Sequence, residues 1–324
     1  MPIMATSFIQ MAYSLTDMAW VGRLGSESMA AVGAVGILTW MSGSIALLNK
    51  VGAEVSVGQS IGARSEEDAR SFASHNITIA LLISVCWGGL LFLFARPILN
   101  IFELKQHITD AAVTYLRIVS TGLPFIFLSA AFTGIYNAAG RSKIPFYISG
   151  TGLIMNIVLD PLFIFGFGWG IKGSAWATVI SQVISLAGQL IHFSRPKELL
   201  HFKKGIYRLK SEIVKGILYI GMSPFLMNLC ACLIVILINR GLKEHGGDMA
   251  IGAYGIVNRV VFLFIMIIMG FNQGMQPIAG YNFGARQYSR VTEVTKLTMK
   301  WAIGVATTAV SYTHLRAHET KANL

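Results

Sequence analysis

The chain has 324 residues, of which 54% are apolar and 13% are charged, and its mean hydropathy is +0.61. Soluble globular domains carry about 25% charged residues, so this composition excludes an ordinary soluble protein. The net charge of +11 does not indicate a nucleic-acid partner, because the cationic side chains lie mostly in short segments between long apolar stretches.

Nine apolar stretches of the sequence could each cross a bilayer as a helix. A crossing needs roughly 20 mostly apolar residues, and backbone polar groups cannot stay unpaired in lipid. We therefore predict an all-α polytopic membrane protein. The stretches cover residues 2–21, 33–61, 72–95, 112–137, 145–167, 172–193, 213–239, 250–280 and 291–310.

The loops carry an uneven distribution of Lys and Arg, with fourteen on one side of the predicted topology and seven on the other. Because the richer side is cytoplasmic, the N-terminus is predicted to be cytoplasmic. The basic segment 194–212 is predicted to be a cytoplasmic linker. It would join a six-helix amino-terminal lobe, residues 1–193, to about three helices of a second lobe, residues 213–310.

A repeat with an offset of about 220 residues is visible in the sequence. The second stretch begins near Met29 with MAAVGAVG and ends at Arg64 with GQSIGAR. The eighth begins near Met249 with MAIGAYGI and ends at Arg286 with GYNFGAR. Repeated bundles with a site between them are a recurrent plan of secondary transporters. We predict a true repeat rather than a chance alignment of Gly and Ala, and we expect the chain to be a truncated pair of bundles.

Two groups of residues receive no chemical role. The three cysteines lie in apolar stretches without metal-ligand spacing, so we expect neither a disulfide nor a metal site and interpret them as small packing residues. Residues 311–324, SYTHLRAHETKANL, interrupt an apolar stretch with charged and histidine side chains. We expect this tail to be non-native, and His314 and His318 are therefore not treated as ligands.

Two carboxyl groups lie inside predicted membrane helices: Asp17 in the first stretch and Asp160 in the fifth. An ionisable side chain within the membrane is costly and is a functional candidate by default. Asn156 precedes Asp160 by one helical turn, so an amide and a carboxyl share one face. Pro161 has no N–H and leaves the carbonyl of Ile157 free for a ligand. Such carboxyls can exchange a proton for substrate or hold a sodium ion; the alternative is that they only cap or pair helices.

Lys50 and Glu54 are four residues apart in the second stretch. This spacing predicts a buried charge pair that faces the bundle interior and neutralises itself. A part in proton coupling is the alternative.

Three segments of the sequence carry a family resemblance. They are LTDMAWVGRLGSESMAAVG at 15–33, NIVLDPLFIFGFGWGIKGSAWATVISQ at 156–182, and GDMAIGAYGIVNRVVFLFIMIIMGFNQGMQPIAGYNFGARQYSRV at 247–291. Together they resemble the multidrug and toxic compound extrusion (MATE) family, in its bacterial multidrug-efflux branch. The resemblance covers nearly all of residues 1–310, and it implies twelve helices in two six-helix lobes around a V-shaped cavity.

The resemblance also implies a cation-coupling and substrate site formed by Asp17, Asn156, Asp160 and Thr178. The first three of these are candidate sodium ligands. Some members carry a Glu in the seventh helix, whereas residues 223–233, SPFLMNLCACL, contain no acid, which argues against a cation site in the second lobe.

The implied function is export of cationic or amphipathic drugs in exchange for protons or sodium ions. The protein would act as a monomer in the bacterial cytoplasmic membrane, without a cofactor. A flippase for lipid-linked oligosaccharides or polysaccharides, from the same superfamily, is the alternative and would favour a more basic central cavity. A membrane enzyme is not supported, because the sequence has no nucleophile elbow, phosphate loop or clustered His and Glu.

Overall fold

The computed structural model describes residues 2–194 and 209–322, which form helices and contain no strand. This confirms the all-α prediction. Most of the predicted linker, residues 195–208, lies outside the described residues. The elements are α1 (Pro2–Gly22), α2 (Ser26–Gly62), α3 (Glu66–Leu93), α4 (Ala95–Asn100), α5 (Gln106–Ala138), α6 (Lys143–Pro161), the π-helical turn η1 (Leu162–Gly166), α7 (Ile171–Phe193), α8 (Ser211–Gly284) and α9 (Tyr288–Ala322).

Six helical segments of the described chain are long and apolar enough to cross a membrane. The remaining predicted stretches lie on α1, on the second half of α8 and on α9. Apolar side chains such as Leu93, Ile154 and Ile191 are more than 60% exposed, which suits a lipid environment. The chain is thus a multi-pass membrane protein. The six segments are Ser26–Gly62, Glu66–Leu93, Gln106–Ala138, Lys143–Gly166, Ile171–Phe193 and Ser211–Val235.

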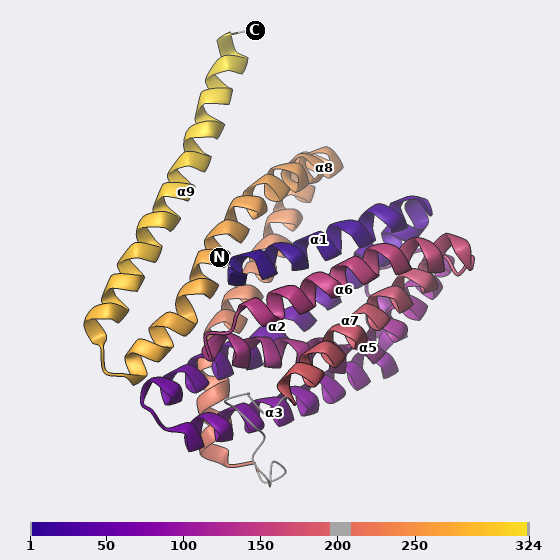
Figure 1. Ribbon diagram of the computed structural model, residues 1–324. Helices are drawn as coiled ribbons and strands as arrows, with labels where there is room; N and C mark the ends of the chain where they lie inside the picture. The colour runs from indigo at the N-terminus through magenta and orange to yellow at the C-terminus, as the bar shows by residue number, and fades with distance from the viewer. Residues whose placement is uncertain (1, 195–208, 323–324) are drawn as a thin grey trace.

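The first bundle is organised around α2 and α5 (Figure 1). α2 packs along α5, α3 and α8, while α5 also packs on α3 and α7. Phe127, Phe132 and Tyr136 of α5 are 1% exposed and fill the interior. α6 lies between α1 and α7 and packs on both. This arrangement brings the faces of α1, α6 and α7 together, although they are far apart in the sequence.

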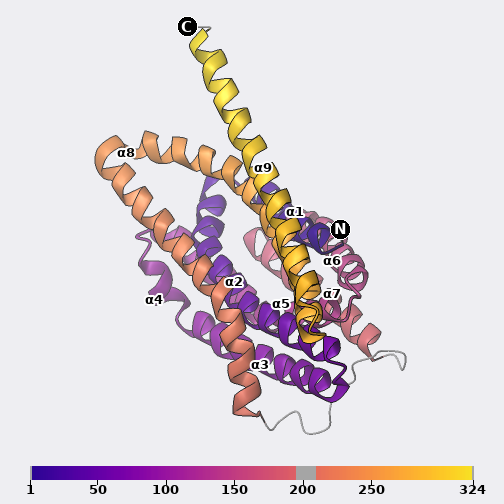
Figure 2. The same ribbon diagram turned by 90° about the vertical axis from the view of Figure 1, so that its left-hand side faces the viewer.

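α8 is one helix of 74 residues that turns back on itself (Figure 2). Its two limbs correspond to the predicted stretches 213–239 and 250–280, which the structure joins without a break in the helix. α9 begins where the second limb ends, packs on α8, and projects away from the bundle (Figure 1). Both limbs contact α2, the first through Gly221 against Leu48 and the second through Gly284 against Gln59.

The crossing of α2 and the second limb of α8 is a contact between backbones. A Cβ added at Gly62 would overlap the carbonyl of Tyr281, and one added at Gly284 would overlap the carbonyl of Gln59. Each glycine meets the carbonyl of the residue that lies three positions before the other glycine in the sequence. Gly62 and Gly284 are 222 residues apart, as are Gln59 and Tyr281. The contact is therefore equivalent from either side, as expected when repeated units meet across a local two-fold axis.

The two repeats also end in the same backbone conformation. Arg64 after α2 and Arg286 after α8 are left-handed, with φ of 59° and 58°. The amide that follows each arginine donates to the carbonyl four residues before that arginine, at 3.0 and 2.8 Å. This is the hydrogen bonding of a Schellman helix end. The matching of GQSIGAR and GYNFGAR therefore reflects a shared structure.

Candidate functional site

Three helices present polar side chains to one another at helical spacing. Side chains three or four residues apart lie on the same face of a helix, so each helix contributes a polar stripe. The stripes consist of Tyr13 and Asp17 on α1, Asn156 and Asp160 on α6, and Ser174, Thr178, Ser181 and Ser185 on α7.

Asp17 is held by two hydroxyl groups from other helices. Its Oδ1 accepts a hydrogen bond from Ser174 Oγ at the beginning of α7, and its Oδ2 accepts one from Tyr115 of α5 at 3.3 Å. Within the described chain Asp17 forms no ion pair. The carboxyl is thus anchored to the bundle by neutral donors, and its charge is not balanced by a basic side chain.

Asp160 and Asn156 are completely buried on α6. Asn156 Nδ2 donates to Asp160 Oδ1 at 3.2 Å. Asp160 Oδ2 and Asn156 Oδ1 have no hydrogen-bond partner among the described residues. Asp17 and Asp160 are close enough for their charges to interact, so the two acids belong to one cluster.

Thr178 lies on α7, partly buried, one helical turn after Ser174. It shares its face with Ser174, which touches Asp17, and with Ser181, which faces Tyr13. The site residues inferred from the sequence therefore occupy facing stripes of α1, α6 and α7. Tyr13, Tyr115, Ser174 and Ser181 were not predicted; a search one turn away from Asp17 and Thr178 would have found Tyr13 and Ser174.

The composition of this cluster fits a proton or a hard monovalent cation. Its polar atoms are mainly oxygens, which hard cations prefer as ligands. Two of them, Asp160 Oδ2 and Asn156 Oδ1, are buried acceptors that the described residues leave without a donor. Such groups are costly unless a proton or cation satisfies them. In the described chain no three His, Cys, Asp or Glu residues are grouped as a transition metal would require.

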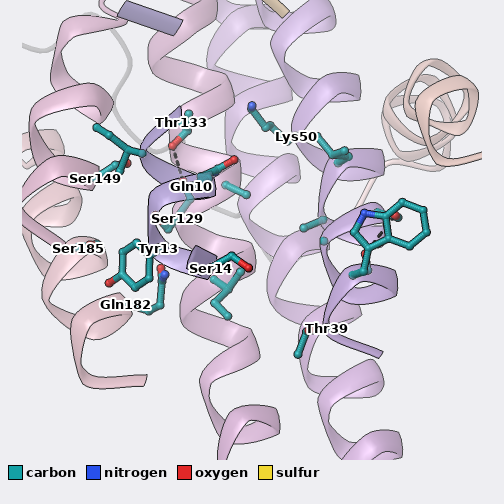
Figure 3. A pocket seen from close by; sticks show the side chains of 18 of the residues that line it. Gln10, Tyr13, Ser14, Thr39, Lys50, Ser129, Thr133, Ser149, Gln182 and Ser185 are labelled. Atoms are coloured by element: carbon teal, nitrogen blue, oxygen red, sulfur yellow. Dashed lines mark hydrogen bonds between the residues drawn. The ribbon is translucent and has the colours of Figure 1, made fainter. Parts of the chain in front are cut away.

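A cavity of about 500 Å³ lies beside the cluster, between α1, α2, α5, α6, α7 and α8 (Figure 3). Its lining combines apolar side chains such as Ile9, Trp40 and Met266 with neutral amides and hydroxyls. Cavities of this size hold drug-sized ligands. The polar lining residues are Gln10, Tyr13, Ser14, Thr39, Ser44, Lys50, Ser129, Thr133, Ser149, Gln182, Ser185, Asn228 and Gln273, together with Trp40.

The cavity adjoins the carboxyl cluster through Tyr13 and through the α6 backbone at Gly152. Tyr13 lines the cavity, and its hydroxyl donates to the carbonyl of Gly152 at 2.8 Å. Ser185 also lines the cavity and is in close contact with the Gly152 backbone, where an added Cβ would overlap its Oγ. A change in the position of α1 would therefore alter the cluster around Asp17 and the cavity wall together.

Lys50 and Glu54, which the sequence predicted to be a buried charge pair, are 8% and 1% exposed. Their charges interact, but no contact within 4.0 Å joins them in the described chain. Lys50 Nζ instead donates to Gln273 Oε1 of α8 at 3.2 Å. Lys50 lines the cavity, whereas Glu54 does not and lies close to Asn137 of α5.

Proteins of similar sequence are named as multidrug resistance or export proteins, and proteins of similar structure are described as MATE or MOP superfamily transporters. The probable multidrug resistance protein YoeA of Bacillus subtilis is 28% identical over 308 residues, which cover 91% of this chain and 65% of that protein. A crystal structure of MATE in the bent conformation matches with a TM-score of 0.93 and 25% identity, covering 98% of this chain and 71% of that one. A MOP superfamily transporter from Pyrococcus furiosus matches with a TM-score of 0.90 and 26% identity, covering 98% and 70%.

This chain therefore spans less than two thirds of the length of YoeA. The model of the MatE family matches residues 2–162 and 220–319, which is most of the chain. The match includes the carboxyl cluster up to Asp160 and both limbs of α8. The chain belongs to the MatE family, the family of multidrug and toxic compound extrusion transporters.

Proposed function

We propose that the protein exports small amphipathic compounds across a bacterial cytoplasmic membrane in exchange for protons or sodium ions. The observation that carries this proposal is the position of Tyr13, which lines the cavity, donates to the α6 backbone at Gly152 and lies close enough to Asp160 for their charges to interact. The relatives' names support it, since YoeA is described as a probable multidrug resistance protein. Relatives in this family are transporters rather than enzymes.

The coupling would run through α1. Asp17 belongs to the carboxyl cluster, while Ile9, Gln10, Tyr13 and Ser14 of the same helix line the cavity. A proton or sodium ion bound to Asp160 Oδ2 and Asn156 Oδ1 would alter the electrostatic environment of Asp17 on α1. A ligand in the cavity would contact the same helix, α1. Competition between the two occupants is the exchange that an antiporter requires.

The decisive variant is Asp160→Asn, which keeps the shape of the side chain and removes its charge. We expect efflux of a fluorescent amphipathic drug from cells expressing this variant to fall to the level of cells without the protein. We also expect the response of efflux to a sodium or pH jump to disappear.

Asp110→Asn is the matched control, because Asp110 is an exposed acid whose partner is Arg96, at 2.5 Å, and not a residue of the cluster. It should transport normally. If Asp160→Asn retains both efflux and its ion dependence, the assignment of the coupling site is wrong.

Orientation and assembly remain part of the proposal. Fourteen of the basic loop residues would face the cytoplasm together with the N-terminus, against seven outside. The protein would function as a monomer, with the substrate and the bilayer as its partners. Accessibility labelling of cysteines introduced in the two sets of loops would test the orientation.

A flippase for lipid-linked oligosaccharides or polysaccharides is a second candidate, favoured by one observation. Lys50 gives the cavity wall a basic group, as expected for a site that receives a diphosphate. The Pyrococcus relative is described as having a binding pocket of reversed polarity that suggests a different function. Flipping of a fluorescent lipid-linked phosphate in proteoliposomes, measured beside dye efflux, separates this candidate from drug export.

A further inference from the structure

Lys50 is the charged side chain in the described lining of the cavity. The acids that suggested a cationic cargo, Asp17 and Asp160, lie outside that lining. Lys50 comes from α2, one turn before the buried Glu54, and is itself only 8% exposed. Figure 3 shows Lys50 in the upper part of the view and Thr39 in the lower part.

The ammonium group of Lys50 has unused hydrogen-bonding capacity. A lysine ammonium carries three N–H donors and no acceptor. The described residues provide one acceptor, Gln273 Oε1 at 3.2 Å, and no carboxylate within 4.0 Å. Two donors of a cationic group in a sheltered cavity are therefore available to a ligand, and an anionic oxygen satisfies such donors best.

Glu54 does not accept a hydrogen bond from the Lys50 ammonium group. It is 1% exposed, lies outside the cavity lining, and its Oε1 has no hydrogen-bond partner among the described residues. Its charge moderates the field of Lys50 through the helix, but it cannot take up the donors of Nζ at the recorded distances. The two ends of this charge pair face different surroundings, with the positive end toward the cavity.

We propose that the cavity takes a drug-sized amphipathic anion, with its acidic group on Lys50 and Gln273 and its apolar body against residues such as Ile9, Trp40 and Met266. This inference rests on the proposed function and defines the class of compound that the transporter would export. The volume of about 500 Å³ fits one compact aromatic body with an acidic head.

Binding of two matched probes tests the proposal. Purified protein in phosphatidylcholine nanodiscs is titrated with 1-naphthalenesulfonate and with (1-naphthyl)trimethylammonium, which share an aromatic body and differ in charge. Calorimetry gives the affinities. The chain has six tryptophans and Trp40 lines the cavity, so the part of the tryptophan fluorescence change that a Trp40→Phe variant loses reports occupancy there. We expect the sulfonate to bind about tenfold tighter or more, because charge-assisted hydrogen bonds form only with the anion.

Variants at Lys50 assign the preference to this side chain. Lys50→Met alone would leave Glu54 unbalanced, so the main variant is Lys50→Met combined with Glu54→Gln. It should lose the tighter binding of the sulfonate, whereas Lys50→Arg should retain most of it. Lys172→Met, at an exposed lysine on α7, is the matched control and should bind both probes like the unmodified protein.

Three results would overturn the inference. They are tighter binding of the trimethylammonium probe, an unchanged preference in the Lys50→Met/Glu54→Gln variant, and loss of sulfonate binding in nanodiscs that contain phosphatidylglycerol, which would make an anionic lipid the occupant. None of these results touches drug efflux or its loss in Asp160→Asn. Failure of this inference is therefore distinguishable from failure of the proposed export.

Discussion

Hydroxyl groups on two other helices hold the Asp17 carboxyl, and their contribution can be measured singly. Ser174→Ala removes the hydroxyl that donates to Oδ1, and Tyr115→Phe removes the donor at 3.3 Å from Oδ2. Hydrogen bonds to charged groups contribute about 1.5–3 kcal/mol. We expect Ser174→Ala to lower the free energy of unfolding by about 1–2 kcal/mol, and Tyr115→Phe to lower it by less because its hydrogen bond is longer. Thermal unfolding in detergent measures both losses.

Ser194→Ala is the control for these variants, because its hydroxyl is exposed and donates to the carbonyl of Leu190 in its own helix. It should leave the unfolding midpoint unchanged. An equal loss in Ser174→Ala and Ser194→Ala would mean that the Asp17 contact contributes nothing beyond a surface hydroxyl.

Single residues could be predicted from the sequence when their partner lies on the same helix. The pairing of Asn156 with Asp160 follows from a spacing of four, and the structure contains that hydrogen bond at 3.2 Å. Tyr115 could not be linked to Asp17 in this way, since 98 residues separate them. The partner of Lys50 was missed for the same reason, because Gln273 follows 223 residues later on another helix.

The left-handed arginines that follow α2 and α8 lead to a prediction about the stability of these helix ends. Arg64 and Arg286 are left-handed, a conformation that costs residues other than glycine about 1–2 kcal/mol. Arg64→Gly and Arg286→Gly should each raise the free energy of unfolding by about 0.5–1 kcal/mol. Lys296→Gly, at an exposed position inside α9, should lower it because glycine disfavours a helix interior. Denaturation of the three variants in parallel measures their free energies of unfolding. A lower value for Arg64→Gly would mean that the left-handed conformation does not strain the arginine.

The helices could be predicted because each contains a long apolar stretch. The connections between them could not be predicted in this way. The stretch 172–193 nearly coincides with α7, Ile171–Phe193. The stretches 213–239 and 250–280 were expected as separate helices, but α8 continues through the intervening residues. The hydrophilic segment between them lowers hydropathy without breaking the helix, since it contains no proline. The π-helical turn after Pro161 gave no separate signal in the apolar pattern.

The α2–α8 crossing leads to a prediction for the whole molecule. Gly62→Ala and Gly284→Ala each place a methyl group against a backbone carbonyl of the other helix, which cannot move aside without shifting that helix. We expect each substitution to destabilise the protein by about 1–3 kcal/mol, and by similar amounts because the two positions are equivalent. Gly36→Ala on α2, where a Cβ meets nothing within 4 Å, should be neutral or stabilising. Thermal unfolding of the three variants tests this; strongly unequal effects of the two crossing variants would contradict the two-fold relation.

The presence of two related repeats was the feature of the whole molecule that could be predicted from the sequence. Matching segments near Arg64 and Arg286 predicted a repeat, and the structure brings their helices into contact. How the repeats face each other could not be predicted, because that depends on the fit of two glycine surfaces and not on periodicity. The cavity was likewise hidden, since its lining comes from six helices.

The glycine crossing lies near one end of α2, and the cavity lies along the rest of that helix. Thr39 is 23 residues from Gly62, a separation of about 35 Å along the helix axis. A swing of about 10° between the helices at the crossing would displace the Thr39 level by about 6 Å while leaving the glycines in touch. A small change in the angle between α2 and α8 at the glycine crossing would thus be enough to widen or close the cavity at the level of Thr39.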